Sequence, residues 1–404
     1  KVLISEFKLS NSKTTLNSTL EFDFPKEGKL STILLNFKEL KSSSYELQDI
    51  YPNIFGTILP SSLQSMGEFV LKGDLLYKSE RIKSNIYLEN KGGKIYSDLD
   101  IYDFQNIDNA SYVGTFKGDN VELSSFITLP FLGKSTFQFS IDGKGFTPEL
   151  LNSSLEGNIQ DLSINNYNYS DINVLGDVSD KIFNGTLNVV DENLEMDFTG
   201  LIDYSDELID FDFSTNIIKA NIGMLGLTSA ENNTLSGNIT TKLRGSNIKD
   251  LIGDVSFSDF KYFSGVNTYN FDELLAQSRI NNDKRFYSID SPDALSGIII
   301  GDLNFLQLPD ILAKHVLANY KNFDSSSYSY DEVSFNLNLK PKIASVLNSE
   351  ILIDENTFIR GNFNEDKSYE FILTSPFLKS KEFSLKNINV KINDNTGYFK
   401  FSDF

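Results

Sequence analysis

The sequence predicts a mostly β protein built as an elongated, repetitive, curled β-sheet with an open groove and a few short helices. Apolar and polar residues alternate in many short segments, and turn-forming residues separate these segments. Because successive side chains of a strand point to opposite faces, each segment presents one apolar face and one face rich in Asn, Asp, Ser, Thr and Lys. A repeat of strand groups along the chain adds a third indication.

The alternating segments follow one another along the chain. The first is the strand-like run from Val2 to Leu9, and the second runs from Leu16 to Phe24. The alternation recurs in the segments 137–141, 183–189, 194–198, 209–213 and 333–339. We predict turns between strands at Asp142-Gly143, Asn184-Gly185 and Lys91-Gly92-Gly93.

Helical patterns are few. The strongest spans Pro309 to Tyr320, where a proline at the start precedes a stripe of apolar residues at helical spacing. A weaker one spans Leu40 to Ile50. The segment from Phe271 to Ile280 fits either a helix or a strand, and we favour a strand.

Two copies of a repeat lie one hundred residues apart. Ile141-Asp-Gly-Lys-Gly145-Phe is matched by Thr241-Lys-Leu-Arg-Gly245-Ser, and both are followed by a strand pattern and a tyrosine. Short turn-like or helix-like elements at 59–63, 129–132 and 308–311 begin the copies. Such repeats indicate a sheet stacked along one axis. We therefore expect one continuous structure over 1–404, with approximate repeats at 57–120, 121–220, 221–321 and 322–404 and a weak linker candidate at 322–329.

The composition excludes several classes of function. The 404 residues include one His and no Cys, which excludes disulfide frameworks, cysteine-protease chemistry and zinc sites built on Cys or on several His. A net charge of -20 argues against nucleic-acid binding, which depends on clustered Lys and Arg. Of 51 aromatic residues, 33 are Phe. No run approaches the ~18 apolar residues that a membrane-spanning helix needs.

Three local motifs have ordinary structural explanations. Gly133-Lys-Ser-Thr136 resembles the end of a phosphate-binding loop, but Thr128 stands where that loop needs a glycine, so we expect a turn that enters a strand. The acidic residues from Asp98 to Asp103 lack the glycine of a calcium loop and fit outward-facing positions on a strand. His315 has no second His or Cys with which to bind a metal. We expect no catalytic site, no metal, no cofactor and no enzymatic activity.

One set of motifs resembles a known family. It runs Gly-x-Gly-Phe-x-Pro-x-x-Leu-Asn, then Leu-x-Gly-x-Ile, Tyr-x-Tyr, Phe-x-Gly-x-Leu and Leu-x-Met-x-Phe-x-Gly. The matching residues are Gly143, Gly145, Phe146, Pro148, Leu151, Asn152, Leu155, Gly157, Ile159, Tyr167, Tyr169, Phe183, Gly185, Leu187, Leu194, Met196, Phe198 and Gly200. This pattern resembles the TamB group of AsmA-like inter-membrane bridge proteins (subunits of the translocation and assembly module), in the form found in Bacteroidota, and is clearest between Gly67 and Leu312.

The resemblance implies a function at the bacterial envelope. It implies a periplasmic bridge between the inner and outer membranes that carries phospholipid along an apolar groove and takes part in outer-membrane biogenesis. The implied partners are phospholipid acyl chains and an outer-membrane barrel protein of the BamA/TamA type, with no nucleic acid. It also implies that an N-terminal inner-membrane anchor and a C-terminal domain lie outside this chain.

The alternation supplies the groove candidates but leaves their role open. Side chains of this kind line an open lipid groove or pack against one another in a closed β-sandwich or solenoid core, and alternation fits both. The alternative functions are a structural or adhesive β-repeat surface protein and an assembly factor that donates or accepts strands for outer-membrane proteins. The candidates are Leu16, Leu20, Phe22, Phe137, Phe139, Ile141, Leu187, Val189, Leu194, Met196, Phe198, Ile209, Phe211, Phe213, Phe335 and Leu337.

Overall fold

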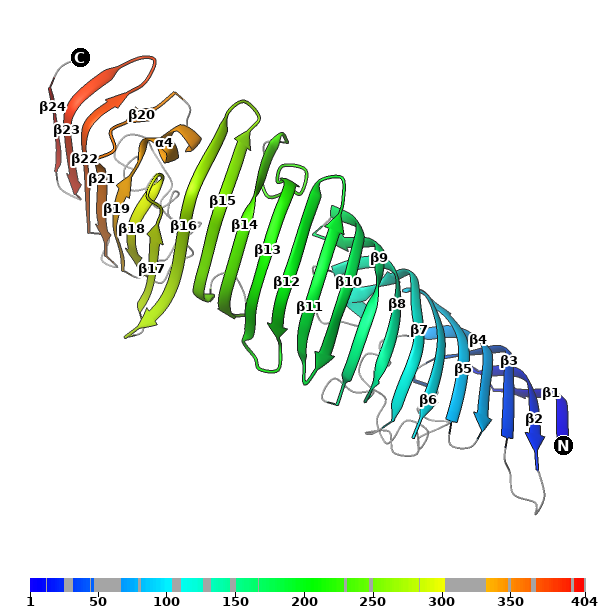
Figure 1. Ribbon diagram of the computed structural model, residues 1–404. Helices are drawn as coiled ribbons and strands as arrows, with labels where there is room; N and C mark the ends of the chain where they lie inside the picture. The colour runs from blue at the N-terminus through cyan, green and yellow to red at the C-terminus, as the bar shows by residue number, and fades with distance from the viewer. Residues whose placement is uncertain are drawn as a thin grey trace. The chain divides into compact units, whose positions relative to one another are not determined.

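The computed structural model is nearly all β, and its antiparallel sheet stays open, as the sequence predicts (Figure 1). The chain divides into two compact units, Lys1–Ser205 and Asp206–Phe404. The expectation of one continuous repetitive structure remains a prediction. The structure describes residues 1–11, 13–24, 32–43, 45–46, 67–78, 81–103, 110–125, 132–145, 150–165, 167–228, 231–246, 250–282, 284–301, 332–347, 350–364, 368–393 and 396–402.

The strands of unit 1 form one antiparallel sheet in which each strand pairs with the next one in the chain. A short 3-10 helix, η1 (Leu123–Ser125), follows β7. The strands are β1 (Val2–Ser10), β2 (Thr15–Asp23), β3 (Thr32–Ser43), β4 (Glu68–Lys78), β5 (Arg81–Asn90), β6 (Gly93–Tyr102), β7 (Ser111–Glu122), β8 (Leu132–Lys144), β9 (Asn152–Ile164), β10 (Tyr167–Ser179), β11 (Ile182–Val190) and β12 (Leu194–Asp203).

Unit 2 repeats this arrangement with one change. The strands pair in chain order except near β20, which pairs with β22, so that β19 lies directly beside β21. Helix α4 (Pro341–Leu347) connects β19 to β20. The strands are β13 (Ile209–Asn221), β14 (Asn233–Gly245), β15 (Ile252–Ser264), β16 (Thr268–Asn281), β17 (Lys284–Asp290), β18 (Leu295–Ile300), β19 (Val333–Leu339), β20 (Leu352–Ile353), β21 (Thr357–Phe363), β22 (Tyr369–Lys379), β23 (Ser384–Asn393) and β24 (Gly397–Ser402).

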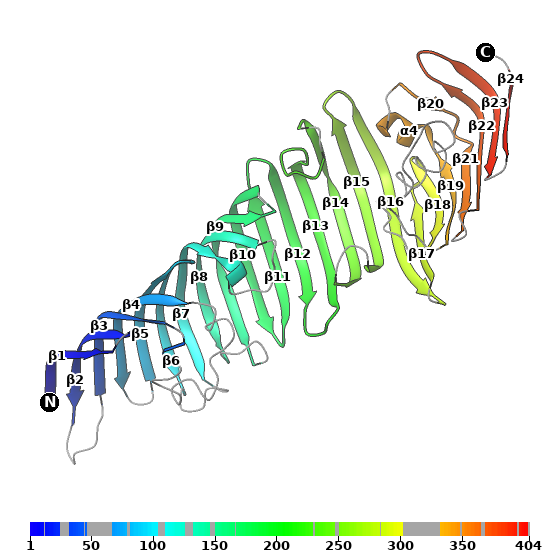
Figure 2. The ribbon, with the colours of Figure 1, turned by 180° about the vertical axis from the view of Figure 1, so that it is seen from behind.

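Several strands of unit 1 contain β-bulges part-way along their length. The register shifts in β3 between Phe37 and Leu40 and in β7 between Gly118 and Val121, and Asn120 has a φ of 55°. Asp171 in β10 has a φ of 49°. Asn and Asp adopt this left-handed conformation more readily than other non-glycine residues, and a bulge bends its strand. Figures 1 and 2 show strands of unit 1 that curl along their length.

Unit 2 uses the same device. The register shifts in β13 between Ile217 and Ala220, and in the pairing of β14 with β15 beside Asp259, whose φ is 53°. A third shift, in β23, includes Asn387 with a φ of 50°. Each sheet is therefore bent by residues whose short polar side chains tolerate the left-handed region.

Some of the predicted local structure is confirmed. The segment from Val2 to Leu9 lies in β1, and the segment from Phe271 to Ile280 lies in β16. Lys91 and Gly92 form the turn between β5 and β6. The acidic residues Asp98 and Asp100 lie in β6.

Other local predictions are wrong. Asp142-Gly143 and Asn184-Gly185 are not turns, because they lie inside β8 and β11 and pair on both sides with neighbouring strands. Of the helix predicted from Leu40 to Ile50, Leu40 to Ser43 are instead the end of β3, whereas Tyr45 and Glu46 are helical. Gly133 to Thr136 belong to β8, which begins at Leu132. In each case pairing along a long strand overrides the local turn or helix signal.

The remaining local predictions lie wholly or mostly outside the described residues. These are the helix from Pro309 to Tyr320, His315, the linker candidate at 322–329, and the elements at 59–63, 129–132 and 308–311, of which only Leu132 is described.

Candidate apolar binding face

One face of the unit 1 sheet carries no charge in its strands. The strand register aligns one row of paired residues across all twelve strands, and neither this row nor the rows beside it contain a charged residue. This face, called the apolar face of unit 1, has no Asp, Glu, Lys or Arg at its paired strand positions. Its central row is Phe7, Ser18, Phe37, Gly73, Ile86, Ser97, Phe116, Phe139, Gly157, Val174, Leu187 and Phe198.

Neighbouring side chains of similar size show that this face is the shielded one. On β11, Val189 is 3% exposed and the adjacent Val190, which points to the opposite side, is 50% exposed. On β10, Val174 is 8% exposed and Leu175 is 58% exposed. Every described strand of unit 1 belongs to this one sheet, so no second sheet among these residues covers the apolar face.

Aromatic rings lie over glycines of the adjacent strand on this face. A Cβ added to Gly118 would stand 2.5 Å from the ring of Phe137, and one added to Gly157 would stand 2.5 Å from the ring of Phe139. The rings of Phe137 and Phe139 contact each other with centroids 5.6 Å apart. The glycines leave room for these rings, which lie close to the backbone of the adjacent strand.

A buried cluster on this face lies on β10 and β11. Ile172, Val174 and Val189 form a buried cluster, and partly buried residues from β8 to β12 pack around it. Phe198 on β12 is 7% exposed. The shielding comes from side chains of the same face.

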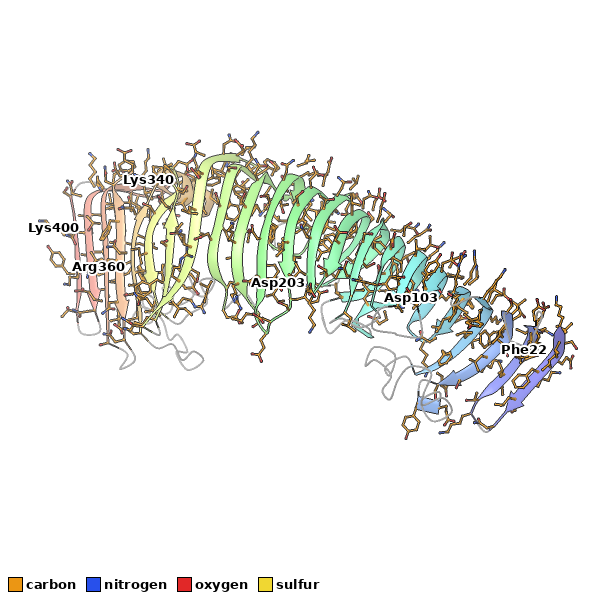
Figure 3. All side chains as sticks on the ribbon, turned by 60° about the horizontal axis from the view of Figure 1, so that its bottom comes forward. Phe22, Asp103, Asp203, Lys340, Arg360 and Lys400 are labelled. Carbon is orange, nitrogen blue, oxygen red and sulfur yellow. The ribbon has the colours of Figure 1, made fainter. Side chains whose placement is uncertain are left out.

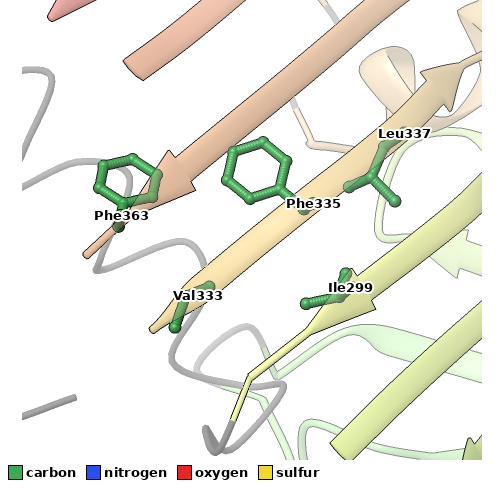
Figure 4. Close-up of a cluster of buried hydrophobic side chains, with 5 residues drawn as sticks. All are labelled: Ile299, Val333, Phe335, Leu337 and Phe363. Carbon is green, nitrogen blue, oxygen red and sulfur yellow. The ribbon is translucent and has the colours of Figure 1, made fainter. Parts of the chain in front are cut away.

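Unit 2 has an apolar face of the same kind. On β18, Ile299 is 1% exposed and its neighbour Ile298 is 48% exposed. Ile299 belongs to a buried cluster with Val333, Phe335, Leu337 and Phe363 (Figure 4). The rings of Phe335 and Phe363 are stacked with centroids 6.0 Å apart.

The outer face of each unit carries most of the charged residues of its strands. Arg81 and Asp100 pair across β5 and β6 with a nitrogen–oxygen distance of 2.5 Å. In unit 2, Arg360 is exposed and the adjacent Gly361 is buried (Figure 3). Surface pairs of this kind add little stability, and their main effect is to keep this side hydrated.

Polar side chains on the outer face of unit 1 form a cross-strand ladder. The Nδ2 of Asn158 donates to the Oδ1 of Asn173 at 3.0 Å, and the Nδ2 of Asn188 donates to the Oδ1 of Asp197 at 2.9 Å. A hollow of about 590 Å³ lies on this polar side over β8 to β11, with Gln138 among its lining residues. It is therefore separate from the apolar face.

A hydrogen-bonded carboxylate fixes the turn between β11 and β12. Asp191 accepts hydrogen bonds from the Tyr167 hydroxyl at 2.5 Å, the Ser170 hydroxyl at 2.8 Å and the Asn193 backbone N–H at 2.9 Å. Partial burial works to raise the pKa of Asp191, but these hydrogen bonds together outweigh burial and lower it. Because its oxygens are already used within the protein, we assign Asp191 a structural role.

All sixteen sequence-predicted groove candidates lie on the apolar faces. Eleven are in unit 1, from Leu16 to Phe198, and five are in unit 2, from Ile209 to Leu337. That they bind lipid remains a prediction. Sequence reasoning missed the bulges and also Arg285, a buried cation on the apolar face of unit 2. The register Arg285, Tyr287, Ile289 on β17 is the signal that could have identified it.

Within the described residues, none of the helices is long and apolar enough to cross a membrane. Comparisons of the chain with family models, with curated proteins and with solved structures return no match.

Proposed function

We propose that this chain is a segment of a lipid-transfer bridge of the TamB type, located in the periplasm. In this proposal phospholipid acyl chains lie on the apolar faces, and lipid moves by diffusion between the inner and outer membranes. No residue makes or breaks a covalent bond. An outer-membrane barrel protein of the BamA/TamA type is the proposed partner, and outer-membrane biogenesis is the proposed process.

The observation that carries the proposal is the uncharged, shielded face that continues over the twelve strands of unit 1. Exposed apolar surface costs about 25 cal/mol per Å², so a face of this extent needs a cover. Among the described residues of unit 1, no second sheet packs on it. Acyl chains match its chemistry because they have no polar group that requires a partner.

The arrangement of polar groups also favours an amphiphilic ligand. The outer face carries hydrogen-bonded amides and ion pairs, which keep the sheet hydrated. A lipid on the apolar face places its chains against residues such as Phe139 and Phe198 and its head group at the margin of the sheet, in water. The net charge of -20 disfavours nonspecific adsorption to anionic membrane surfaces.

Site-specific photo-crosslinking tests this proposal. A photoreactive residue at Phe139 or Phe198 is expected to capture labelled phospholipid in cells. Matched probes at Leu175 and Val190, which lie on the outer face of β10 and β11, are expected to capture none. Crosslinks to protein alone from both apolar positions would refute the lipid function and support a packed core or an adhesive surface protein.

The edge strands support a second candidate function, an assembly factor that pairs with strands of other proteins. All six residues of β24 are exposed, including Phe399 and Phe401 at 48% each, and Leu3 on β1 is 60% exposed. An exposed, apolar edge strand is a template for strand addition. Proline at Phe399 is expected to abolish client crosslinks at β24 and to leave lipid crosslinks at Phe139 unchanged. Client crosslinks that persist in this variant would exclude strand addition there.

A further inference from the structure

A buried charged residue lies among the paired strand positions of the apolar face of unit 2. Arg285, near the start of β17, faces the same side as Tyr287 and Ile289 and is 8% exposed. A buried cation is costly unless an anion or several hydrogen bonds compensate it.

The described contacts of Arg285 use one of its three side-chain nitrogens. Its Nη1 donates to the backbone oxygen of Leu251 at 2.8 Å and lies 3.4 Å from the hydroxyl of Ser278. No described carboxylate lies within ion-pair distance of the guanidinium. A guanidinium has five N–H donors, so its contacts with the described residues use only part of its capacity.

The cations near Arg285 each have a carboxylate partner among the described residues. Lys284 pairs with Glu332 at 2.5 Å, and Arg279 on the outer face pairs with Asp254 at 2.6 Å. Lys342 of α4 pairs with Asp293. Arg285 is therefore the neighbouring cation whose counter-ion is not supplied by the described protein.

Arg285 lies near the start of β17, at one end of the strand. Arg285 pairs with Ile280 at the strand ends, and Ile280 is 50% exposed. The guanidinium thus sits at the margin of the sheet, where an anion can reach it from water.

Toward the interior of the face, the surface becomes apolar. Tyr287 follows Arg285 on the same face and packs against the cluster of Ile299, Val333, Phe335, Leu337 and Phe363. A ligand that satisfies both regions has an anionic group at one end and a hydrocarbon chain at the other. Planar guanidinium groups bind phosphate oxygens with paired hydrogen bonds, which is the geometry that such a head group offers.

We propose that Arg285 binds the phosphate head group of a phospholipid whose acyl chain lies across the apolar face of unit 2. This inference rests on the proposed lipid function and adds a head-group preference to it. Arg285 holds the head group at the margin, and the apolar cluster accepts the chain. The face then binds lipids that carry an accessible phosphate more tightly than uncharged lipids with the same chains.

The test compares two fluorescent lipids with identical acyl chains on the purified full chain: phosphatidic acid and diacylglycerol. The unaltered protein is expected to bind phosphatidic acid about tenfold more tightly, the effect of a hydrogen bond to a charged group. Arg285→Gln and Arg285→Met are expected to remove this preference and to leave diacylglycerol binding unchanged. Methionine removes the buried charge and fills a similar volume, so it covers the case in which the glutamine variant fails to fold.

Arg279→Gln is the matched control, because Arg279 lies on the outer face of the adjacent strand, and it is expected to keep the preference. A preference that survives in both Arg285 variants overturns the inference. So does inorganic phosphate that binds as tightly as phosphatidic acid. If diacylglycerol and phosphatidic acid both fail to bind the unaltered protein, the lipid function itself fails. If both bind equally, that function stands and only the role of Arg285 is lost.

Discussion

Two adjacent valines on β11 provide a direct test of the shielded face. Val189 is 3% exposed and faces the cluster around Ile172 and Val174, and Val190 is 50% exposed on the outer side. We predict that Val189→Asp strongly destabilises unit 1 and that Val190→Asp has almost no effect. The two substitutions are chemically identical and one residue apart. The difference between their free energies of unfolding therefore depends only on which face of the sheet the substituted residue occupies.

The expected magnitude follows from the cost of keeping the new carboxyl neutral. An aspartate has an ordinary pKa of about 3.9, and each pKa unit corresponds to about 1.4 kcal/mol, so protonation near pH 7 costs about 4 kcal/mol. Loss of the buried valine side chain adds about 1.5 kcal/mol. Together these approach the total stability of many domains, about 5–15 kcal/mol. For Val190→Asp the expected change is within about 0.5 kcal/mol.

Urea unfolding followed by tyrosine fluorescence measures both variants. Burial raises the folded-state pKa of the new carboxyl above its unfolded value, so the destabilisation by Val189→Asp grows as pH rises above about 4 and shrinks as pH falls toward it. If that variant does not fold, Val189→Thr replaces it, with an expected loss of about 1–3 kcal/mol from a buried hydroxyl. Equal stabilities for the Val189 and Val190 variants would refute the shielded face.

Two further substitutions test the construction of unit 1. Gly118→Ala is expected to lower the free energy of unfolding in urea by about 1–3 kcal/mol, because the added Cβ meets the Phe137 ring. A second substitution, Phe137→Leu, should restore part of that loss. If Gly118→Ala leaves the stability unchanged, the placement of the ring is contradicted. Asp191→Asn is expected to cost about 1 kcal/mol near neutral pH, since solvent screens the partly exposed group. Because the folded-state pKa of Asp191 is lowered, its stabilisation is present above about pH 4 and is lost as pH falls. The free energies of unfolding of the unaltered protein and of Asp191→Asn should therefore become equal in acid. A difference that does not change with pH would exclude this role.

The alternation in the sequence was sufficient to predict the β class, several of the strands and the face on which their apolar residues lie, because a buried face fixes the parity of a strand. It was insufficient where a local signal competes with pairing. Asn184-Gly185 has the composition of a hairpin turn, yet Gly185 lies opposite both Gly176 and Gly200 in the middle of three long strands. Three glycines in one row are the sign that this position needs a close approach of backbones and not a turn.

The bulges were missed because they change the parity of the pattern part-way along a strand. On β9 the apolar positions run through Ile159 and then continue at Leu162, and on β7 they run through Gly118 and continue at Val121. A search for strict alternation ends a strand at such a step. Asn120, at the step in β7, is the residue type that tolerates the required conformation, so a parity change that contains Asn or Asp is the recognisable signature.

The distribution of charge decides how a lipid chain could move over these faces. Along the apolar face of unit 1 the paired strand positions are aromatic, aliphatic, Met, Ser and Gly residues, with Asn90 at the end of β5, so a chain that passes from one strand to the next breaks no ion pair. At Gly118 and Gly157 no side chain projects from the face, and aromatic rings from the next strand occupy the space above these glycines. On the face of unit 2, Arg285 introduces one position where a head group has a specific partner. If the proposed lipid function holds, the uncharged face of unit 1 favours free movement of the chain, and Arg285 on the face of unit 2 gives the head group a preferred resting position.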